Sequence, residues 1–359
     1  METTNKRLLS LDVLRGITVA GMILVNNGGG HDIFAPLKHS DWNGLTPCDL
    51  VFPFFLFIMG ISTYLSLSKF DFKPSKSAIY KIVKRTLLIL VIGWCIGWFD
   101  HICEGDFLPF DHLRILGVLT RIGLCYGIVS LIALFINHRF MLWIAAALLI
   151  LYSIILLTSN GYVHDETNIL AIIDRSIFGQ AHLYQKNPID PEGFVSTISA
   201  IAHTMIGFYC GKIIVKSKSI DEKVIKLMIF GFIIMSIGLL LTYSLPINKK
   251  IWSPSFALTT CGLCSMLQST LMYFIDIKGK KKWSKFFVVF GVNPLFLYVL
   301  SEVLAIVFGN FGIKHMLYNG INTFIGEPYT ASAIYAIAFT LMLGAIGYPL
   351  YRKRIYIKL

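Results

Sequence analysis

The sequence predicts an all-α membrane protein, a single-domain bundle of about ten transmembrane spans over residues 1–359, with both termini cytoplasmic. Hydrophobic residues make up 55% of the chain and charged residues 14%, compared with about 25% in soluble domains. The mean hydropathy is +0.69. In addition, the apolar runs approach the roughly 20 residues that cross a bilayer.

The apolar stretches are separated by polar connections that alternate between two sides. We expect spans at residues 8–29, 48–68, 82–99, 113–136, 140–157, 194–215, 224–245, 255–275, 286–309 and 331–351. The expected outer loops are 30–47, 100–112, 158–193, 246–254 and 310–330. The loop 158–193 is long enough to pack over the bundle.

Basic residues distinguish the two sides. Of the 32 Lys and Arg residues, 23 fall near the termini or within 69–85, 139, 212–226 and 278–285, whereas six fall in the outer loops. The positive-inside rule therefore makes the first set cytoplasmic. The net charge of +12 reflects this topology, so the expected partner is a lipid bilayer and not nucleic acid.

The first span carries Asp12 and Arg15 one helical turn apart inside apolar sequence. It ends near Asn26 and continues into a loop that holds His31 and His39. Charges inside a membrane helix are costly to insert, so they indicate a functional site more often than an anchor.

The fourth span contains Arg114 and Arg121, which share one helical face because they are seven residues apart. Two buried cations need counter-charges, for which Asp12, Asp49, Asp111 and Glu302 are available. A structural ion-pair role is one interpretation. The alternative is a pair of cations that face an anionic ligand, to which the guanidinium fork is suited.

Further polar residues surround the later spans. Asp190 and Glu192 precede the sixth span, where an acid at a helix start is equally consistent with a stabilising interaction with the helix dipole. His203 lies inside that span, and Asn293 and Glu302 lie in the ninth, which Pro294 breaks. A broken span is tolerated where it lines a cavity, so these residues predict a polar chamber within the bundle.

His39 is the better candidate of the two loop histidines for proton transfer near neutral pH. It lies beside Trp42 and a turn at 43–44, whereas His31 follows three flexible glycines. Asn26 offers an amide donor to a developing oxyanion. A purely structural role for His39 is the alternative.

The run from Arg7 to Gly60 resembles the heparan-α-glucosaminide N-acetyltransferase family, including its bacterial homologues. The segments 113–123, 190–193, 252–256 and 291–294 match in the same order. The resemblance implies transfer of acetyl from cytosolic acetyl-CoA, the donor substrate, to the amine of a glucosamine-type acceptor across the membrane. It also implies that His39 is the catalytic histidine and Asn26 the assisting asparagine.

Eukaryotic members carry a lumenal domain and a further span ahead of the Arg7-type motif, which here begins at once. We therefore expect a bacterial homologue in the inner membrane, with the His39 loop facing the periplasm and an acceptor other than heparan. The resemblance also implies a dimer, so a homodimer is one alternative for the assembly.

The expected reaction is direct transfer without a metal, and an acetyl-histidine intermediate is the rival path. The residues expected to bind the sugar or CoA are Asp12, Arg15, Asp49, Arg114, Arg121, Asp190, Glu192, His203, Asn293 and Glu302. Two other classes of function compete with an enzyme. One is an amino-sugar transporter, suggested by the broken span but lacking a visible inverted repeat, and the other is a non-catalytic membrane scaffold.

Overall fold

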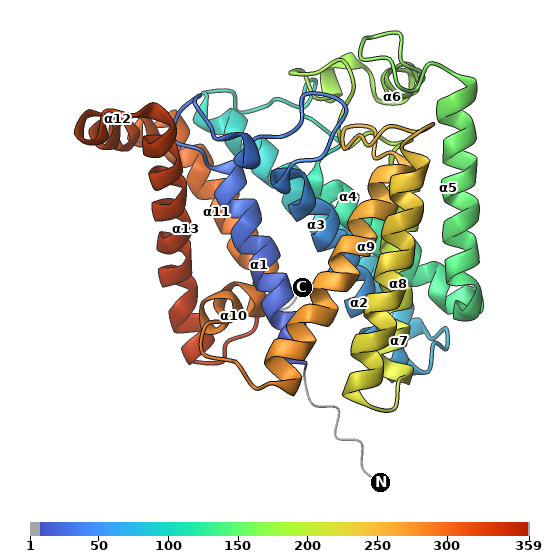
Figure 1. Ribbon diagram of the computed structural model, residues 1–359. Helices are drawn as coiled ribbons and strands as arrows, with labels where there is room; N and C mark the ends of the chain where they lie inside the picture. Colours follow the sequence, from blue (N-terminus) through green and yellow to red (C-terminus); the bar gives the residue numbers. More distant parts are fainter. Residues whose placement is uncertain (1–7, 358–359) are drawn as a thin grey trace.

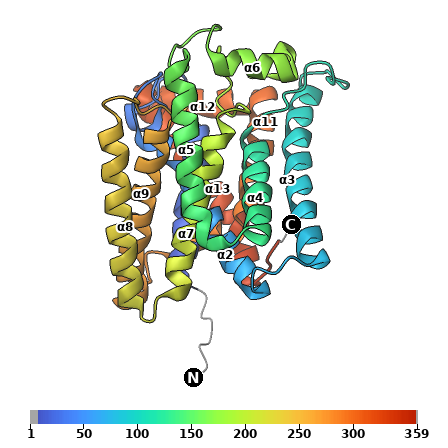
Figure 2. The ribbon, with the colours of Figure 1, turned by 90° about the vertical axis from the view of Figure 1, so that its right-hand side faces the viewer.

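The computed structural model describes residues 8–357, whose long helices run side by side as a bundle (Figure 1, Figure 2). This part of the chain contains no strand. The helices are α1 (Leu9–Asn26), α2 (Val51–Leu67), α3 (Lys76–Cys103), α4 (Val118–Phe135), α5 (Met141–Thr158), α6 (Ile169–Phe178), α7 (Thr197–Lys216), α8 (Ile220–Leu241), α9 (Pro254–Leu271), α10 (Lys285–Val292), α11 (Pro294–Asn310), α12 (Ile313–Ile325) and α13 (Pro328–Arg352).

The prediction of about ten spans in an all-α fold is confirmed. Within residues 8–357, nine helices are long and apolar enough to cross a bilayer, some of them extended by a short turn. The remaining predicted span, the ninth along the chain, is broken, because α10 and α11 meet at a bend of 85°. Pro294 lacks an amide hydrogen and disfavours the helical conformation at Asn293, so the break falls at the proline.

Two shorter helices lie outside the spans. The helix α6 lies in the segment 158–193 and crosses one end of the bundle (Figure 2). The helix α12 falls in the segment 310–330, for which only a loop was predicted. Gly312 and Gly326 bound α12 in left-handed conformations, with φ of 72° and 74°. It projects sideways from the bundle with apolar side chains such as Phe324 exposed (Figure 1).

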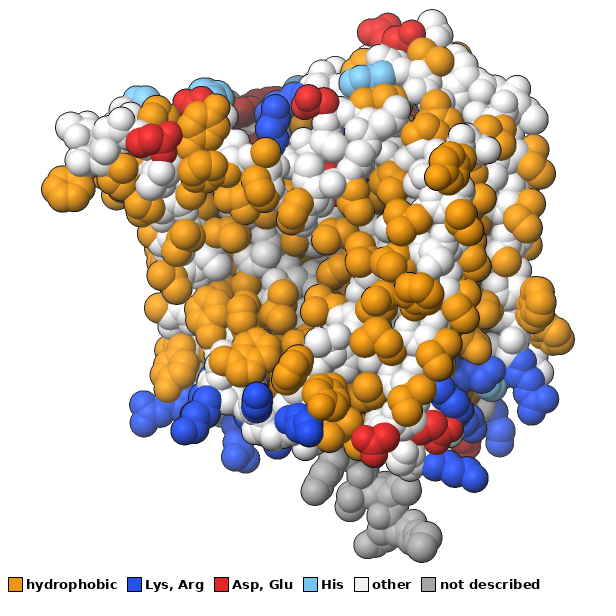
Figure 3. Space-filling view, in the orientation of Figure 1, with side chains coloured by type: hydrophobic (Ala, Val, Ile, Leu, Met, Phe, Trp, Pro, Cys, Tyr) orange, Lys and Arg blue, Asp and Glu red, His pale blue; other side chains and the backbone are white. Residues whose placement is uncertain are grey.

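Cationic side chains gather at one end of the bundle. On the face shown in Figure 3, most Lys and Arg lie along the lower end, below a broad apolar band. The helix α1 begins and α13 ends at this end (Figure 1), which we call the basic end. The opposite end, formed by residues 27–50, 104–117, 159–196, 242–253 and 311–327, is called the outer end. Lys6, Arg7 and Lys358 of the predicted basic set lie outside the described residues.

The helices α2 and α7 pack backbone against backbone at Gly60 and Gly207. A Cβ atom at Gly60 would lie 2.2 Å from the carbonyl oxygen of Thr204, and one at Gly207 would lie 2.2 Å from that of Phe57. Small residues let membrane helices approach this closely. The crossing fixes the relative positions of the segments that precede α2 and α7.

We expect Gly207→Ala to lower thermal stability, because the added methyl group meets a backbone atom that cannot rotate away. Overpacking of this kind costs about 1–3 kcal/mol. The matched control is Gly309→Ala in α11, where a Cβ atom has no neighbour within 4 Å. Thermal unfolding in detergent checks the prediction, which is wrong if the two variants unfold at the same temperature.

Candidate functional site at the outer end

His39 lies in the loop between α1 and α2 and pairs with a buried carboxylate. Its Nδ1 atom is 2.7 Å from Oδ1 of Asp49. The Asp49 side chain is completely buried, whereas 47% of the His39 side chain is exposed. If Nδ1–H donates to the carboxylate, the lone pair is placed on Nε2. The arrangement is that of a histidine oriented by an acid, as a general base requires.

Local backbone geometry holds the Asp49 carboxylate in place. Its Oδ2 atom accepts hydrogen bonds from the backbone N–H of Thr46 at 3.1 Å, the Thr46 hydroxyl at 3.0 Å and the backbone N–H of Ser40 at 3.2 Å. Thr46 and Asp49 form a capping box at the turn Pro47–Leu50, just before α2. The turn therefore leaves Oδ1 directed at His39. Sequence reasoning treated Asp49 as a counter-charge or ligand contact, and the structure pairs it with the histidine instead.

Lys249 was counted only as a topological charge, yet it reaches His39. Its Nζ atom lies 3.0 Å from Nδ1 and 3.3 Å from Nε2 of the ring, and 3.5 Å from Oδ1 of Asp49. Burial lowers the pKa of Lys249, although the Asp49 carboxylate opposes this shift. Cys48 is a second neighbour that sequence reasoning missed, with Sγ 3.1 Å from Nδ1.

A strained turn brings Lys249 to the site. The backbone N–H of Trp252 donates to the Lys249 carbonyl at 3.0 Å, and Trp252 has a φ of 51°, which is rare for a bulky residue. The Trp252 side chain is buried and makes edge contacts with Phe52, His203 and Phe256. These contacts hold the turn, a role that was not predicted from the sequence.

Arg114 pairs with both acids that precede α7. Its Nη2 atom lies 2.6 Å from Oδ1 of Asp190 and 2.7 Å from Oε2 of Glu192. The guanidinium also lies over the ring of Tyr184, 4.6 Å from its centroid. Burial opposes the charge of Arg114, but the two carboxylates outweigh this effect and raise its pKa. Neither acid caps α7, which has no side-chain cap and begins only at Thr197.

Arg121 is fully buried and contacts the same segment by a different route. Its Nη2 atom donates to the Gly193 carbonyl at 2.9 Å and to the Ser196 hydroxyl. Its guanidinium lies 5.1 Å from the ring centroid of Trp252. The two arginines therefore converge on residues 190–196, although only Arg114 forms ion pairs there. The prediction that they share one helical face was wrong, because α4 begins at Val118 and Arg114 lies in the segment before it.

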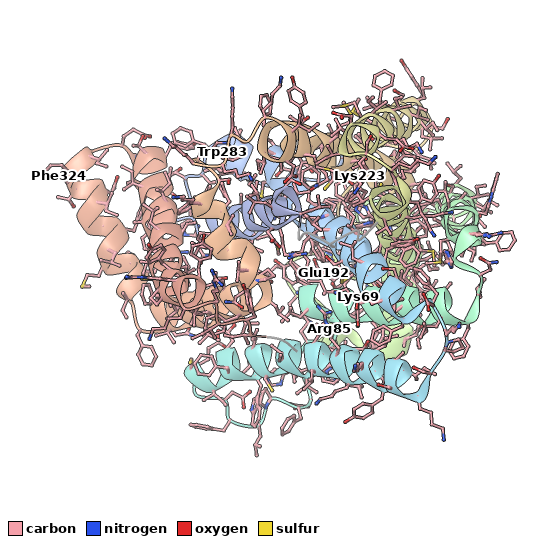
Figure 4. The ribbon with its side chains drawn as sticks, turned by 90° about the horizontal axis from the view of Figure 1, so that it is seen from below. Lys69, Arg85, Glu192, Lys223, Trp283 and Phe324 are labelled. Carbon is pink, nitrogen blue, oxygen red and sulfur yellow. The ribbon has the colours of Figure 1, made fainter. Side chains whose placement is uncertain are left out.

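Asn26 and Glu302 belong to a neighbouring part of this end. The Glu302 carboxyl, on α11, is hydrogen-bonded to the side chains of Asn26 and Tyr298. Tyr298 in turn interacts electrostatically with Glu192 and Arg114. Glu192 interacts in the same way with Lys249. Viewed along the bundle, Glu192 lies inside the outline of the helices (Figure 4). These groups, together with His39 and Asp49, make up what we call the outer cluster.

The remaining predicted residues have other surroundings. His203 is fully buried and its Nε2 atom lies 2.9 Å from the Pro53 carbonyl. Asn293 binds the C-terminal segment, donating to the Ile355 carbonyl at 2.9 Å and accepting from the backbone N–H of Ile357 at 2.8 Å. Both contacts are those of residues that join segments of the fold.

Asp12 and Arg15 lie toward the basic end of α1. They form an ion pair at 3.2 Å, and Arg15 also donates to Ser62 at 2.9 Å. Asp12 borders a cavity of about 470 Å³ between α1, α10 and the C-terminal segment. Arg352 and Arg354 are exposed and line the same cavity, so it is bordered by cationic side chains. The predicted polar residues thus divide between the two ends of the bundle.

Asp174, on α6, is a buried acid that sequence reasoning did not single out. Its Oδ1 atom accepts from the backbone N–H of Phe194 at 3.0 Å, and Oδ2 has no hydrogen-bond partner. Burial raises its pKa to about 6, against an ordinary value of 3.8, and the charge of Asp190 adds to this shift.

Because the folded state favours the protonated acid, stability contributed by Asp174 is complete below about pH 4 and lost as the pH rises through about 6. The difference corresponds to about 3 kcal/mol. We therefore expect Asp174→Asn to raise thermal stability at pH 7.5 and to flatten its pH dependence between 4 and 7. Unfolding curves of this variant and the exposed control Asp32→Asn check this, and an unchanged profile in Asp174→Asn would refute it.

Comparison with known proteins places the chain in a family. A family model described as the catalytic region of heparan-alpha-glucosaminide N-acetyltransferase matches residues 7–247. The heparan-alpha-glucosaminide N-acetyltransferases of Mus musculus and Homo sapiens are each 29% identical to it over 413 aligned residues. These alignments cover 98% of the chain but 60% of each relative, so the chain spans less than two thirds of their length. Together, the matched region and these relatives show that the chain belongs to the heparan-α-glucosaminide N-acetyltransferase family.

Proposed function

We propose that this protein is a transmembrane N-acetyltransferase that transfers acetyl from acetyl-CoA to the amine of a glucosamine-type sugar at the outer end. The observation that carries the proposal is the 2.7 Å contact between the half-exposed His39 and the buried Asp49. The family match favours acyl transfer over the transporter and scaffold alternatives.

In the proposed reaction His39 acts as the general base. The acceptor amine attacks the thioester carbonyl, a C–N bond forms, and Nε2 of His39 takes the proton that the nitrogen loses. The C–S bond then breaks and CoA leaves as a thiolate, which the imidazolium can protonate. Asp49 stabilises the imidazolium that forms, because its carboxylate accepts from Nδ1–H.

The developing oxyanion needs a donor nearby. Lys249 is the closest cation to the His39 ring, with Nζ at 3.0 and 3.3 Å from its two nitrogens. Asn26, the last residue of α1, is implicated by the family resemblance. Its side chain is hydrogen-bonded to Glu302 on α11. We propose that Lys249 stabilises the negative charge of the tetrahedral intermediate. Asn26 is proposed to bind the sugar or to donate a hydrogen bond to the carbonyl oxygen.

The donor is proposed to enter from the basic end, which we take to face the cytosol by the positive-inside rule. The cavity beside Asp12, which Arg352 and Arg354 also line, suits the phosphates of CoA. Along α1, Asp12 and Asn26 are separated by about 21 Å. The thioester arm would therefore run along α1 towards the outer cluster.

Release of CoA thiol by purified protein tests the proposal. Acetyl-CoA with glucosamine should give release, whereas acetyl-CoA with N-acetylglucosamine, which lacks a free amine, should not. Equal CoA release with glucosamine and with N-acetylglucosamine, or no release with any amino sugar, would contradict the proposal. Acetyl-CoA alone distinguishes the two paths, because a kinetically competent acetyl-His39 species would replace direct transfer with a two-step reaction.

A further inference from the structure

A second cluster of chemically active side chains lies at the outer end, apart from the outer cluster. His101 belongs to the last turn of α3, and Asp106 and His112 belong to the loop that follows. One ligand atom from each lies within 4.8 Å of the other two. No other such group of histidine, cysteine and acidic side chains occurs within residues 8–357.

The orientation of His112 is suited to binding a cation. Its Nδ1 atom lies 2.9 Å from Oδ1 of Asp111, and its Nε2 atom lies 3.0 Å from Oδ2 of Asp106. A carboxylate that accepts from one ring nitrogen fixes the tautomer and leaves the other nitrogen as a ligand. Asp111 therefore plays the part that an outer carboxylate plays behind a metal-bound histidine.

Backbone hydrogen bonds hold the three side chains in this arrangement. The backbone N–H of Asp106 donates to the His101 carbonyl at 2.9 Å, and that of His112 donates to the Pro109 carbonyl at 3.1 Å. The indole N–H of Trp98 donates to the Phe107 carbonyl at 3.0 Å. The loop is thus fixed to the end of α3 without any ion, so a site exists before a ligand arrives.

We propose that His101, Asp106 and His112 bind a divalent transition metal of the Zn²⁺ type. Two imidazoles and one carboxylate are ligands that this class of cation favours. The three side chains are 28%, 42% and 44% exposed, respectively, so an ion can enter from solvent. Glu104, with Oε2 3.6 Å from Nδ1 of His101, or a water molecule completes the coordination.

The bound ion is a structural clip and takes no part in acyl transfer. It joins the end of α3 to the loop that continues through Leu113 to Arg114, whose ion pairs belong to the outer cluster. Leu113 is itself tied to the loop before α7, because its carbonyl lies 2.8 Å from Nδ1 of His182. Metal binding is therefore expected to stabilise the outer end.

The test is Zn²⁺ titration of the full chain, purified without a histidine tag and stripped of metal, with calorimetry and thermal unfolding as readouts. Co²⁺ absorption in the visible range reports the coordination geometry. The variants are His112→Ala, Asp106→Asn and Asp111→Asn. The matched control is His315→Ala, which removes a histidine of α12 at the outer end whose Nε2 atom lies 2.9 Å from the amide nitrogen of Asn319.

Wild type and His315→Ala should each bind one Zn²⁺ and unfold at a higher temperature with it. Asp111→Asn should weaken binding by about 10–100-fold, as loss of a partner behind a ligand does, and the two ligand variants should weaken it at least as much. Asp106→Asn preserves shape if His112→Ala fails to fold. The proposal is overturned if wild type shows no Zn²⁺-dependent shift, or if all the variants bind Zn²⁺ as wild type does.

Discussion

His39→Ala is expected to reduce acyl transfer by about 10²–10⁴-fold, the contribution of a positioned general base. The reason is that no other imidazole shares its contact with the buried Asp49. CoA release with saturating glucosamine measures the effect. Thermal unfolding of the variant should change little, because the His39 side chain is 47% exposed.

The matched control is His31→Ala, which removes the other histidine of the same loop and should leave activity near that of wild type. Asp49→Asn keeps the shape of the pair but removes its charge, so activity should fall although His39 is present. If His31→Ala abolishes transfer and His39→Ala does not, the assignment of His39 as the base is wrong. The proposal that the protein is an acyltransferase would still hold.

Arg114→Leu is expected to be the most destabilising single change at the outer end, by about 3–5 kcal/mol. It leaves two carboxylates, Asp190 with 0% and Glu192 with 11% of the side chain exposed, without their cation. Thermal or denaturant unfolding measures the loss. Lys226→Leu, which breaks the exposed helical pair with Glu222, is the control and should change stability little, because solvent screens this pair.

A double-mutant cycle separates this ion pair from general packing. Asp190→Asn in the Arg114→Leu background removes one of the two uncompensated charges, so the double variant should lose less stability than the sum of the two single variants. Additive losses would show that Arg114 acts through packing on Tyr184 and not through its carboxylates.

The spans were predictable because crossing a bilayer demands long apolar helices, a requirement that hydropathy records directly. Pro294 likewise predicted the break between α10 and α11, because proline disrupts a helix. In contrast, α12 was missed. The helix is short, and Lys314 and several polar residues interrupt its apolar ones. The segment therefore lacks the long apolar run that predicts a span.

The composition of the candidate site was only partly predictable. His39, Arg114, Asp190 and Glu192 were identified as chemically interesting, but the partners were not, because contacts such as Lys249 with His39 join residues 210 positions apart. Those contacts depend on which faces of packed helices meet, and no single sequence gives that register. The hydrogen bonds of His203 and Asn293 to backbone carbonyls of other segments could not be predicted from the sequence either.

The most direct test of the proposed transfer uses protein reconstituted in sealed vesicles. Acetyl-CoA is supplied only on the side that the basic end faces, and glucosamine only on the side of the His39 loop. Wild-type vesicles should produce N-acetylglucosamine on the glucosamine side and CoA on the other, and His39→Ala vesicles should produce neither. Product formed only when both substrates share one side, or formed equally by His39→Ala, would contradict acetyl transfer through the bundle to an outer His39–Asp49 pair.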